Sequence, residues 1–396
     1  MTTASGGPVP GGAPPIAHIV GRFPPPVDGQ TLATELVAEL LEGAREVRRF
    51  NTQKSTRDPL GRVDGVGAGR VAYFLRRRRA LREALAAAPE APVLWHSISP
   101  GRVGHWRDAI ATLPAFAPGQ PVAAVLHRSG FGDLFRSPLT APTARRVVER
   151  VDRFVIQSRS LAAACAPHVP PEKVVLIPNT LDAAITPPPE AVERARAERL
   201  ARRATHGPLR LLYLSQLLPT KGYREVLEAV PLLRAGGVDV RADFVGGWNA
   251  EADRDAFDAF VRQHGLEGAV TAHGSIADRA RAQAFFLSAD VFLLPTYYPP
   301  ETQPKAILEA LAAGTPVVVT EHASIPEMVR GGREARFVAK RSPEAVAGAV
   351  RALADTDAWR EASRDARERF ESTFAPEAIA ERWLGLLRTL EDLRRP

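Results

Sequence analysis

The chain has 396 residues, of which 45% are hydrophobic and 24% are charged, as is typical of globular proteins. No apolar run approaches the ~20 residues of a membrane-spanning helix. The only cysteine, Cys165, excludes an internal disulfide and fits a reducing compartment, so we expect a cytoplasmic protein.

The basic excess lies in the first half of the chain. Residues 1–185 hold 23 Lys and Arg against 15 Asp and Glu, whereas the remainder holds 29 against 30. Candidate partners for this half are an anionic lipid surface, a phosphate-bearing acceptor and a nucleic acid. Nucleic acid is not expected, because aromatic residues are few here and no nucleic-acid motif is present.

Residues 1–15 are rich in Gly and Pro and are expected to be a disordered leader. They lack the charged region and apolar core of a secretory signal. A short strand at 16–20 is followed by a Gly/Pro loop and a helix over 32–41. In this loop Gly29 would permit close backbone approach to a ligand, and Thr31 is the expected N-cap. An ordinary turn between strand and helix explains the loop equally well.

The GVGAGRV stretch at 65–71 is not a dinucleotide fingerprint, because its sixth position is Arg70 and no strand precedes it. A helix with a basic face is predicted over 71–85, with four arginines at 76–79. Such a run is usually a solvated face, and a membrane-surface or acceptor-binding role is the alternative.

Strands over 93–96 and 122–127 each end in a histidine, His96 and His127. The carboxyl ends of parallel strands are where α/β proteins build their sites. A histidine there can also simply bond the backbone. The nine histidines and one cysteine show no zinc-type spacing, and no metal site is predicted. Strands over 151–157 and 174–177 would complete this domain.

A charged helical segment over 184–206 connects to a second alternating series that starts with the strand 209–214. Lys221 follows this strand, just before Gly222 and a helix, and is well placed for a diphosphate. A solvated loop lysine is the ordinary alternative. The next strand ends in glycines, and HGSI follows the strand 269–272. An amphipathic helix is predicted over 376–393.

The stretch from 292 to 328 reads as strand, loop, helix and strand. Pro304 stands in the first helical turn, and Glu309 is expected about two turns, roughly 11 Å, along the helix. Free N–H groups of Gln303 and Lys305 would make an anion site there. Carboxylates such as Glu301 beside an anion site suit a ligand with both phosphates and hydroxyls, as in a nucleotide sugar. Surface glutamates favoured by the helix dipole are the ordinary alternative.

The sequence ETQPKAILEALAAGTPVV resembles the paired-glutamate signature of retaining GT-B glycosyltransferases of the GT4 type, the group 1 family. The resemblance extends from residue 16 to about residue 390 and is strongest over 209–330. It implies an α/β GT-B fold with two Rossmann-like domains facing each other across a cleft. Residues 16–185 would bind the acceptor and 186–375 the donor, and a helix in 376–396 would return to the first domain.

The resemblance also implies roles for individual residues. Glu301, His127 and Lys221 are the candidate catalytic residues: Glu301 and His127 would contact the sugar, and Lys221 would stabilise the departing diphosphate. Glu309 would hold the ribose hydroxyls. The other implied donor-binding residues are Gln216, Thr302, Gln303, Pro304, Lys305, Gly274, Ser275, Ile276 and Gly246, and the acceptor and diphosphate loop is Asp28, Gly29 and Gln30. The family usually has an arginine where this chain has Gln216, and Lys305 is the candidate to compensate.

The resemblance therefore implies metal-independent, retaining transfer of a hexosyl group from a UDP- or GDP-sugar to a sugar or lipid-linked acceptor. Glycan, glycolipid or polysaccharide biosynthesis is the expected setting, without a cofactor and with peripheral contact at the inner face of the membrane as a candidate. One alternative is another GT-B reaction such as nucleotide-sugar epimerisation. The other, favoured by Gln216, is a basic membrane- or glycan-binding protein with a degenerate site.

Overall fold

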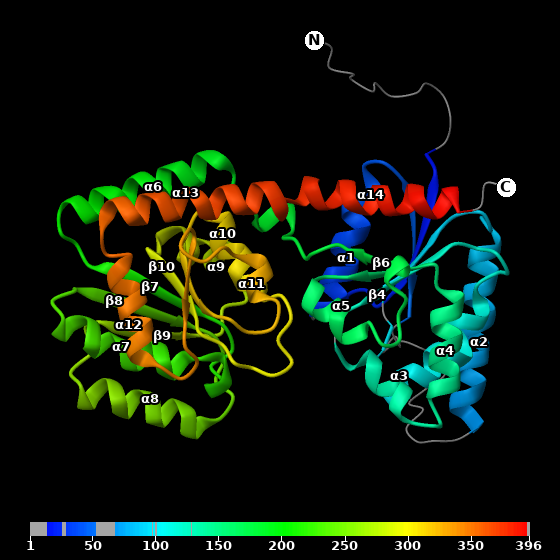
Figure 1. Ribbon diagram of the computed structural model, residues 1–396, viewed down its shortest axis with the longest axis horizontal. Coiled ribbons are helices and arrows are strands. Elements are labelled where there is room, and N and C mark those ends of the chain that lie inside the picture. The colour runs from blue at the N-terminus through cyan, green and yellow to red at the C-terminus, as the bar shows by residue number, and fades with distance from the viewer. Residues whose placement is uncertain are drawn as a thin grey trace, which may run out of the picture. The chain divides into compact units, whose positions relative to one another are not determined.

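The structure, a computed structural model, describes residues 14–25, 29–52, 68–96, 98–99, 101–127 and 129–393. They form two compact units, drawn in Figure 1. Unit 1 contains the chain up to Ile156, Ala164–Val175 and the residues from Ala380 onward, and unit 2 contains Gln157–Ala163 and Leu176–Ile379. Each unit has its own six-stranded sheet covered by helices, which confirms the predicted class of two Rossmann-like α/β units. Asp28 and most of the proposed leader lie outside the described residues.

The sheet of unit 1 has the strand order β2-β1-β3-β4-β5-β6. The chain passes from β1 to β2 on one side and then to β3 on the other, so the direction of winding reverses between β1 and β3. In open α/β sheets such a reversal is the usual place for a ligand. The strands are β1 Ile16–Gly21, β2 Glu46–Asn51, β3 Val93–Trp95, β4 Val122–Leu126, β5 Arg153–Ile156 and β6 Val174–Leu176.

The helices of unit 1 include the last one of the chain. From Ala380 onward α14 belongs to this unit: Trp383 is buried in it, and Glu391 forms an ion pair with Arg45. The α-helices that contribute to unit 1 are α1 Gly29–Glu42, α2 Ala68–Ala86, α3 Arg102–Arg107, α4 Ala141–Arg150, α5 Arg159–Cys165 and α14 Pro376–Asp392. Shorter turns are the π-helix η1 Asp108–Thr112 and the 3-10 helices η2 Leu113–Ala115, η3 Ser129–Arg136 and η4 Pro171–Lys173.

Two features of unit 1 differ from the prediction. Thr31 is not an N-cap, because α1 already begins at Gly29 and Thr31 is completely buried inside it. Strand β2 was not expected, since its sequence EVRRFN lacks an apolar run. It lies at the edge of the sheet and pairs only with β1 among the described strands, so charged side chains are tolerated there.

The sheet of unit 2 has the order β12-β11-β10-β7-β8-β9, and its winding reverses between β7 and β10. All residues of β10 and β11 are buried, because helices cover both faces of this parallel sheet (Figure 1). The strands are β7 Leu209–Leu214, β8 Val240–Val245, β9 Val270–Gly274, β10 Val291–Leu294, β11 Val317–Thr320 and β12 Ala335–Val338.

The helices of unit 2 form two layers. One face of the sheet carries α7 Tyr223–Ala235, α8 Glu251–Gln263 and α12 Pro343–Ala352, and the other carries α6 Pro189–Ala204, α9 Arg279–Ser288, α10 Lys305–Ala312 and α13 Thr356–Thr373 (Figure 1). The remaining elements are α11 Ile325–Met328 and the 3-10 helices η5 Ala183–Ile185 and η6 Pro219–Lys221.

A buried arginine closes the C-terminal end of α10. Arg199 of α6 is 1% exposed and donates to the carbonyl of Ala313 at 3.1 Å and to Thr315 Oγ1 at 3.0 Å. From α13, Ser363 donates to the Gly314 carbonyl at 2.7 Å. A cation and hydrogen-bond donors at this end satisfy the last carbonyls and complement the helix dipole. Side chains of α6 and α13 therefore hold the C-terminal end of α10 in position.

None of the helices in the described part of the chain is long and apolar enough to cross a membrane.

Candidate active site

An ion pair lies at the point where the winding of unit 2 reverses. Lys221 comes from the loop after β7 and Glu301 from the loop after β10, and Lys221 Nζ lies 2.5 Å from Glu301 Oε2. The side chains are only 15% and 9% exposed. Tyr298 places its ring 4.6 Å from the same ammonium, and Thr296 Oγ1 lies 3.4 Å from Glu301 Oε2. Two predicted site residues that are 80 positions apart are thus held together where α/β sheets bind ligands.

Gly222 allows these two loops to approach each other. It adopts a left-handed conformation with φ of 88°, and a Cβ there would lie 2.5 Å from the Pro295 carbonyl oxygen. The backbone N–H of Tyr297 donates to the Thr220 carbonyl at 2.8 Å. A side chain at position 222 would force these loops apart, and Lys221 would move away from Glu301.

The start of α10 carries the second predicted glutamate. The helix begins at Lys305, after Pro304 as N-cap, and no side chain caps it. Glu309 is therefore just over one turn from the helix start, not the predicted two turns. The reason is that proline disfavours helical backbone in the residue before it, here Gln303, so residues 301–303 stay in the loop.

Glu309 is partly buried, and two cations, Lys305 and Arg279, lie near its carboxylate. Burial raises its pKa, and nearby Lys305 and Arg279 oppose that rise. The pKa of Lys305 is lowered, first by burial and then by Arg279. Arg279 itself forms a 2.9 Å ion pair with Asp182. Two cations and two carboxylates thus gather beside the first turn of α10, and Lys305 is one of the two cations.

The predicted glycine-bearing turns meet at the ends of β8 and β9. The N–H of Gly246 donates to the Gly274 carbonyl at 2.9 Å. A Cβ on Gly246 would lie 1.8 Å from the Ser215 carbonyl oxygen, so only glycine fits there. Gly274 has φ of 69° with open space around its Cβ position, and Ser275 is exposed. Ile276 instead packs against the core of unit 2. The turn at Gly274 and Ser275 therefore has open space beside it, as a base-contacting turn would need.

Three other residues predicted to bind the sugar donor differ in their exposure and in their hydrogen bonds. Gln216 is exposed, and its carbonyl accepts the Tyr213 hydroxyl at 3.0 Å. The side chain of Gln303 is occupied within the protein: it donates to the Gln157 carbonyl and accepts from the Asn179 N–H, both at 2.8 Å. The Thr302 carbonyl accepts the hydroxyl of Ser324.

The predicted residues of unit 1 lie at its winding reversal between β1 and β3, or after the neighbouring strand β4. His127 follows β4 and is half-buried, and its ring centroid is 4.7 Å from that of His96, which follows β3 and is 1% exposed. Gly29 and Gln30 form the first residues of α1, and Arg22 donates to Gln30 Oε1 at 3.0 Å. The part of the acceptor and diphosphate loop that is described thus lies on the same edge of the sheet as the histidines.

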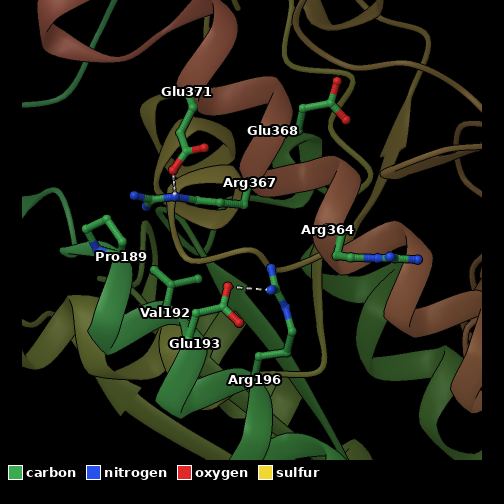
Figure 2. A pocket seen from close by; sticks show the side chains of 8 residues that line it. All are labelled: Pro189, Val192, Glu193, Arg196, Arg364, Arg367, Glu368 and Glu371. Atoms are coloured by element: carbon green, nitrogen blue, oxygen red, sulfur yellow. Dashed lines mark hydrogen bonds and ion pairs between the residues drawn. The ribbon is translucent and has the colours of Figure 1, made fainter.

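Two hollows in the described part of unit 2 lie away from these residues. One is a groove of about 210 Å³ between α6 and α13. In it Arg196 pairs with Glu193 and Arg367 with Glu371 (Figure 2). Arg367 also donates to the Ala312 carbonyl at 2.6 Å, at the C-terminal end of α10. A second hollow of about 570 Å³ adjoins it near the start of α14. Neither contains a predicted site residue, and the paired charges point to a structural role.

Metal chemistry has no preformed site in the part of the chain that is described: no group of three or more His, Cys, Asp or Glu side chains there is arranged to hold an ion.

Sequence reasoning missed several residues around the site. Thr296 and Tyr298 line the ion pair, and Arg279 lies beside Glu309. Thr296 and Tyr298 directly follow strand β10, and that position was a usable signal. Arg279 had no such signal in the sequence, because its neighbours Asp182 and Glu309 are distant from it along the chain.

Comparison with known proteins finds a family match within unit 2. A family model described as Glycosyl transferases group 1 matches residues 208–356. Among curated proteins, the putative colanic acid biosynthesis glycosyltransferase WcaL of Salmonella typhimurium is 30% identical over 218 residues, which are 51% of this chain and 52% of WcaL. Glycogen synthase of Mycobacterium tuberculosis is 28% identical over 283 residues, 70% of this chain and 66% of the synthase. The matches thus span about half to two thirds of these relatives.

Solved structures extend the comparison to the whole fold. Anabaena Alr3699/HepE in complex with UDP superposes with a TM-score of 0.67 at 18% identity, over 95% of this chain and all of that one. Sucrose-phosphate synthase from Thermosynechococcus elongatus gives 0.67 at 20% identity, over 96% and 100%. At these identities the likeness concerns the fold. The chain therefore has the GT-B fold, and its residues 208–356 match the family model of the group 1 glycosyl transferases.

Proposed function

We propose that the protein is a retaining, metal-independent glycosyltransferase of the GT4 type that moves a hexosyl group from a nucleoside diphosphate sugar to an acceptor hydroxyl. The observation that carries the proposal is the buried Lys221–Glu301 pair at the winding reversal of unit 2, beside the start of α10. A cation, a carboxylate and uncapped helix N–H groups together match a ligand that carries both phosphates and hydroxyls.

Lys221 and Glu301 can serve the donor at the same time. An ammonium has three N–H donors, so Lys221 can keep its bond to Glu301 and still donate to a phosphate oxygen. The free carboxylate oxygen of Glu301 can accept a sugar hydroxyl. The ion pair would therefore hold the sugar and the diphosphate in a fixed relation to each other.

The proposed step breaks the bond between the anomeric carbon and the β-phosphate oxygen and forms one to the acceptor oxygen on the same face. The acceptor proton passes to the leaving phosphate. Lys221 and the first N–H groups of α10 would stabilise the charge that develops on the diphosphate. Glu301 would stabilise the positive charge at the anomeric carbon, and His127 would contact the sugar.

Glu309 would bind the ribose hydroxyls, with Gly246, Gly274 and Ser275 presenting backbone groups to the base. Lys305 and Arg279 oppose the rise that burial causes in the pKa of Glu309, and so favour the charged carboxylate, which is the form that accepts two hydroxyls. Gln216 can offer an amide hydrogen bond to phosphate at the position where the family resemblance implies an arginine.

The comparisons support a UDP-sugar as the first donor to test. HepE structures are described with UDP, with UDP and glucose, and with UDP-glucose. A GDP-sugar is the second, since a GDP-mannose-dependent mannosyltransferase of Mycobacterium tuberculosis matches 38% of this chain. The printed functions of WcaL and of an amylovoran biosynthesis glycosyltransferase of Erwinia amylovora support polysaccharide biosynthesis as the setting.

A peripheral membrane contact through unit 1 is part of the proposal. Helix α2 exposes Arg76, Arg79 and Leu75, and Trp106 and Leu139 expose 39% and 74% of their surface. Arginines with exposed aromatic and aliphatic side chains suit an anionic lipid surface, which would bring the enzyme to a lipid-linked acceptor. Sedimentation with vesicles of anionic and of zwitterionic lipid tests it, and equal sedimentation with both would count against it.

The function is tested by thermal shift with UDP-, GDP-, ADP- and TDP-sugars in the presence of EDTA. A bound donor at a hundredfold excess over Kd should stabilise the protein by about 2.7 kcal/mol. NMR of the product formed from the stabilising donor would then give the anomeric configuration. Binding followed by a change in the sugar without transfer would indicate epimerisation. Absence of stabilisation by every donor would favour the binding-protein alternative.

A further inference from the structure

We propose that His322 is a positioning residue for Glu301. By donating a hydrogen bond to the Tyr298 carbonyl, His322 holds the turn that carries Glu301 beside Lys221. The inference deepens the proposed function, on which it rests for the role of Glu301 toward a sugar. It concerns a histidine for which the sequence predicted no role.

The loop after β11 holds the loop after β10 through three side chains. Alternate residues, beginning with the last residue of β11, each donate a hydrogen bond to a backbone carbonyl within residues 296–302. The three donor and acceptor pairs are Thr320 with Thr296, His322 with Tyr298 at 2.7 Å, and Ser324 with Thr302. Glu301 lies within the segment whose carbonyls are held in this way.

The His322 bond acts on the residue that contacts both members of the ion pair. The Tyr298 carbonyl also accepts the backbone N–H of Glu301 at 3.0 Å, so it is the carbonyl that closes the Glu301 turn. The centre of the Tyr298 ring lies 4.6 Å from Lys221 Nζ. A displacement of Tyr298 would therefore shift Glu301 and Lys221 relative to each other.

The hydrogen of the neutral His322 ring has one position that satisfies both recorded contacts of its nitrogens. A backbone carbonyl only accepts, so Nε2 must carry the hydrogen. Lys340 Nζ lies 3.3 Å from Nδ1, and an ammonium only donates, so Nδ1 is the acceptor. Neither partner can reverse its role, and the ring is held from both sides.

These contacts follow the order of the strands in the sheet of unit 2. Lys340 follows β12, His322 follows β11 and Tyr298 follows β10. The next strand in the sheet is β7, and the loop after it supplies Lys221. Side chains at one edge of the sheet thus connect the end of β12 with the ion pair.

Burial and backbone strain set His322 apart from an ordinary loop residue. Thr320 and Ser324 are 0% and 2% exposed, so their hydroxyls need a partner inside the protein whatever its function. His322 is only partly buried, and water could satisfy its ring, yet it bonds the Tyr298 carbonyl. Ala323, between His322 and Ser324, adopts a left-handed φ of 50°, which is uncommon for a residue with a Cβ. Such strain persists where surrounding contacts hold it, and it clusters at functional sites.

The consequence for the reaction concerns the transfer step more than binding of the nucleotide. In the proposed site the nucleotide is held by Glu309, by the start of α10 and by the glycine turns. None of these contacts His322 among the recorded contacts of the described residues. Without His322, the turn would lose a bond to the Tyr298 carbonyl, and the Glu301 carboxylate would occupy additional positions.

The test uses three variants of the full chain. His322→Leu removes the donor, and His322→Gln keeps a side-chain N–H near the position of Nε2. The matched control is His264→Leu, because His264 of the same unit also donates to a backbone carbonyl, that of Phe260 at 3.0 Å. His264 lies at the end of α8 and contacts no residue of the loop after β10 among the recorded contacts of the described residues.

The first readout is structural and needs no donor. Thermal melts give the non-additivity of K221M and E301Q, which should fall by about half or more in the H322L background. It should stay unchanged in the H322Q and H264L backgrounds. NMR of histidine-labelled wild type should show the hydrogen of neutral His322 on Nε2.

The second readout is kinetic. H322L should lower kcat about fivefold to tenfold, as expected for the loss of one hydrogen bond, while Kd for the nucleoside diphosphate stays within about twofold. H322Q should recover most of kcat, and H264L should retain the wild-type kcat.

The outcomes separate the inference from the proposed function. Unchanged non-additivity in folded H322L, or a His322 hydrogen on Nδ1 in the wild type, would overturn the positioning role whatever the activity. Equal losses of kcat in H322L and H264L, or no recovery in H322Q, would reduce His322 to a packing residue. A lower non-additivity in H322L, with no transfer from any donor in the wild type, would leave the positioning of Glu301 standing and remove the proposed reaction.

Discussion

The Lys221–Glu301 pair should contribute to the stability of unit 2 before any donor binds, and replacing Lys221 by Met tests this directly. The change leaves the Glu301 carboxylate, whose side chain is 9% exposed, with Thr296 Oγ1 at 3.4 Å as its remaining close side-chain partner. Removing one partner of a buried pair typically destabilises by about 3–5 kcal/mol, and because Lys221 is partly exposed we expect about 3 kcal/mol. For a unit of this size that corresponds to a fall in Tm of about 6–12 °C.

The coupling between the two residues is the sharper quantity. The double variant K221M/E301Q has no unpaired charge, so it should be destabilised by about 2 kcal/mol less than the sum of the single variants. Because the two units need not unfold together, hydrogen exchange in peptides covering β10 and α10 should accompany the thermal melts. The control is Arg254→Met, which removes an exposed 3.8 Å contact with Asp258 and should change stability by less than about 0.5 kcal/mol.

Two results would refute this reasoning. Additive effects of K221M and E301Q would show that the side chains do not interact in solution. A K221M variant as stable as R254M would show that Glu301 does not depend on Lys221. In either case the fixed relation between sugar and diphosphate would lose its structural basis.

Three further predictions each concern a single residue. Burial raises the pKa of Asp108 to about 6, so the folded protein holds that proton more tightly than the unfolded chain; this stability, about 2–3 kcal/mol, is present below pH ~4 and lost as pH rises through about 6. Thermal melts from pH 4 to 7 should show that loss in the wild type and lack it in D108N, and parallel curves for the two proteins would contradict it. Gly246→Ala should destabilise unit 2 by more than about 3 kcal/mol, since its Cβ would lie 1.8 Å from a carbonyl oxygen, whereas Gly268→Ala, with open space, should be nearly neutral in the same melts. Glu309→Ala should weaken donor binding at least tenfold by calorimetry, about 1.4 kcal/mol, and a change within twofold would remove Glu309 from the ribose site.

The sequence predicted the two sheets, apart from strand β2, and the edges on which the candidate site lies. Strand and loop chemistry placed Lys221, Glu301 and His127 directly after strands, and the reversal of winding then brought the first two together. Local signals sufficed because parallel strands end on one edge of a sheet.

Contacts that depend on packing were beyond such reasoning. That Lys221 and Glu301 form a pair depends on Gly222 lying against Pro295, and no residue pattern encodes that approach. The start of α10 was misplaced by a turn because the effect of Pro304 on the preceding backbone was not applied. His96 was predicted only as a strand-end histidine without metal spacing, and the side chains that contact it, Thr34 and His127, come from α1 and from the loop after β4.

The cap of α10 has a consequence for exchanging donor domains between relatives. The segment that matches the family model, residues 208–356, is not a self-sufficient part, because Arg199 lies before it and Ser363 lies after it. In a chimera cut at those limits, Arg199 of this chain would face an α10 from the other parent. If that helix ended at a different position, the buried guanidinium would lose its hydrogen bonds to the helix carbonyls. Junctions placed before α6 and after α13, near residues 188 and 374, keep the helix and its cap from one parent, and these are the boundaries at which a transplanted donor specificity should survive.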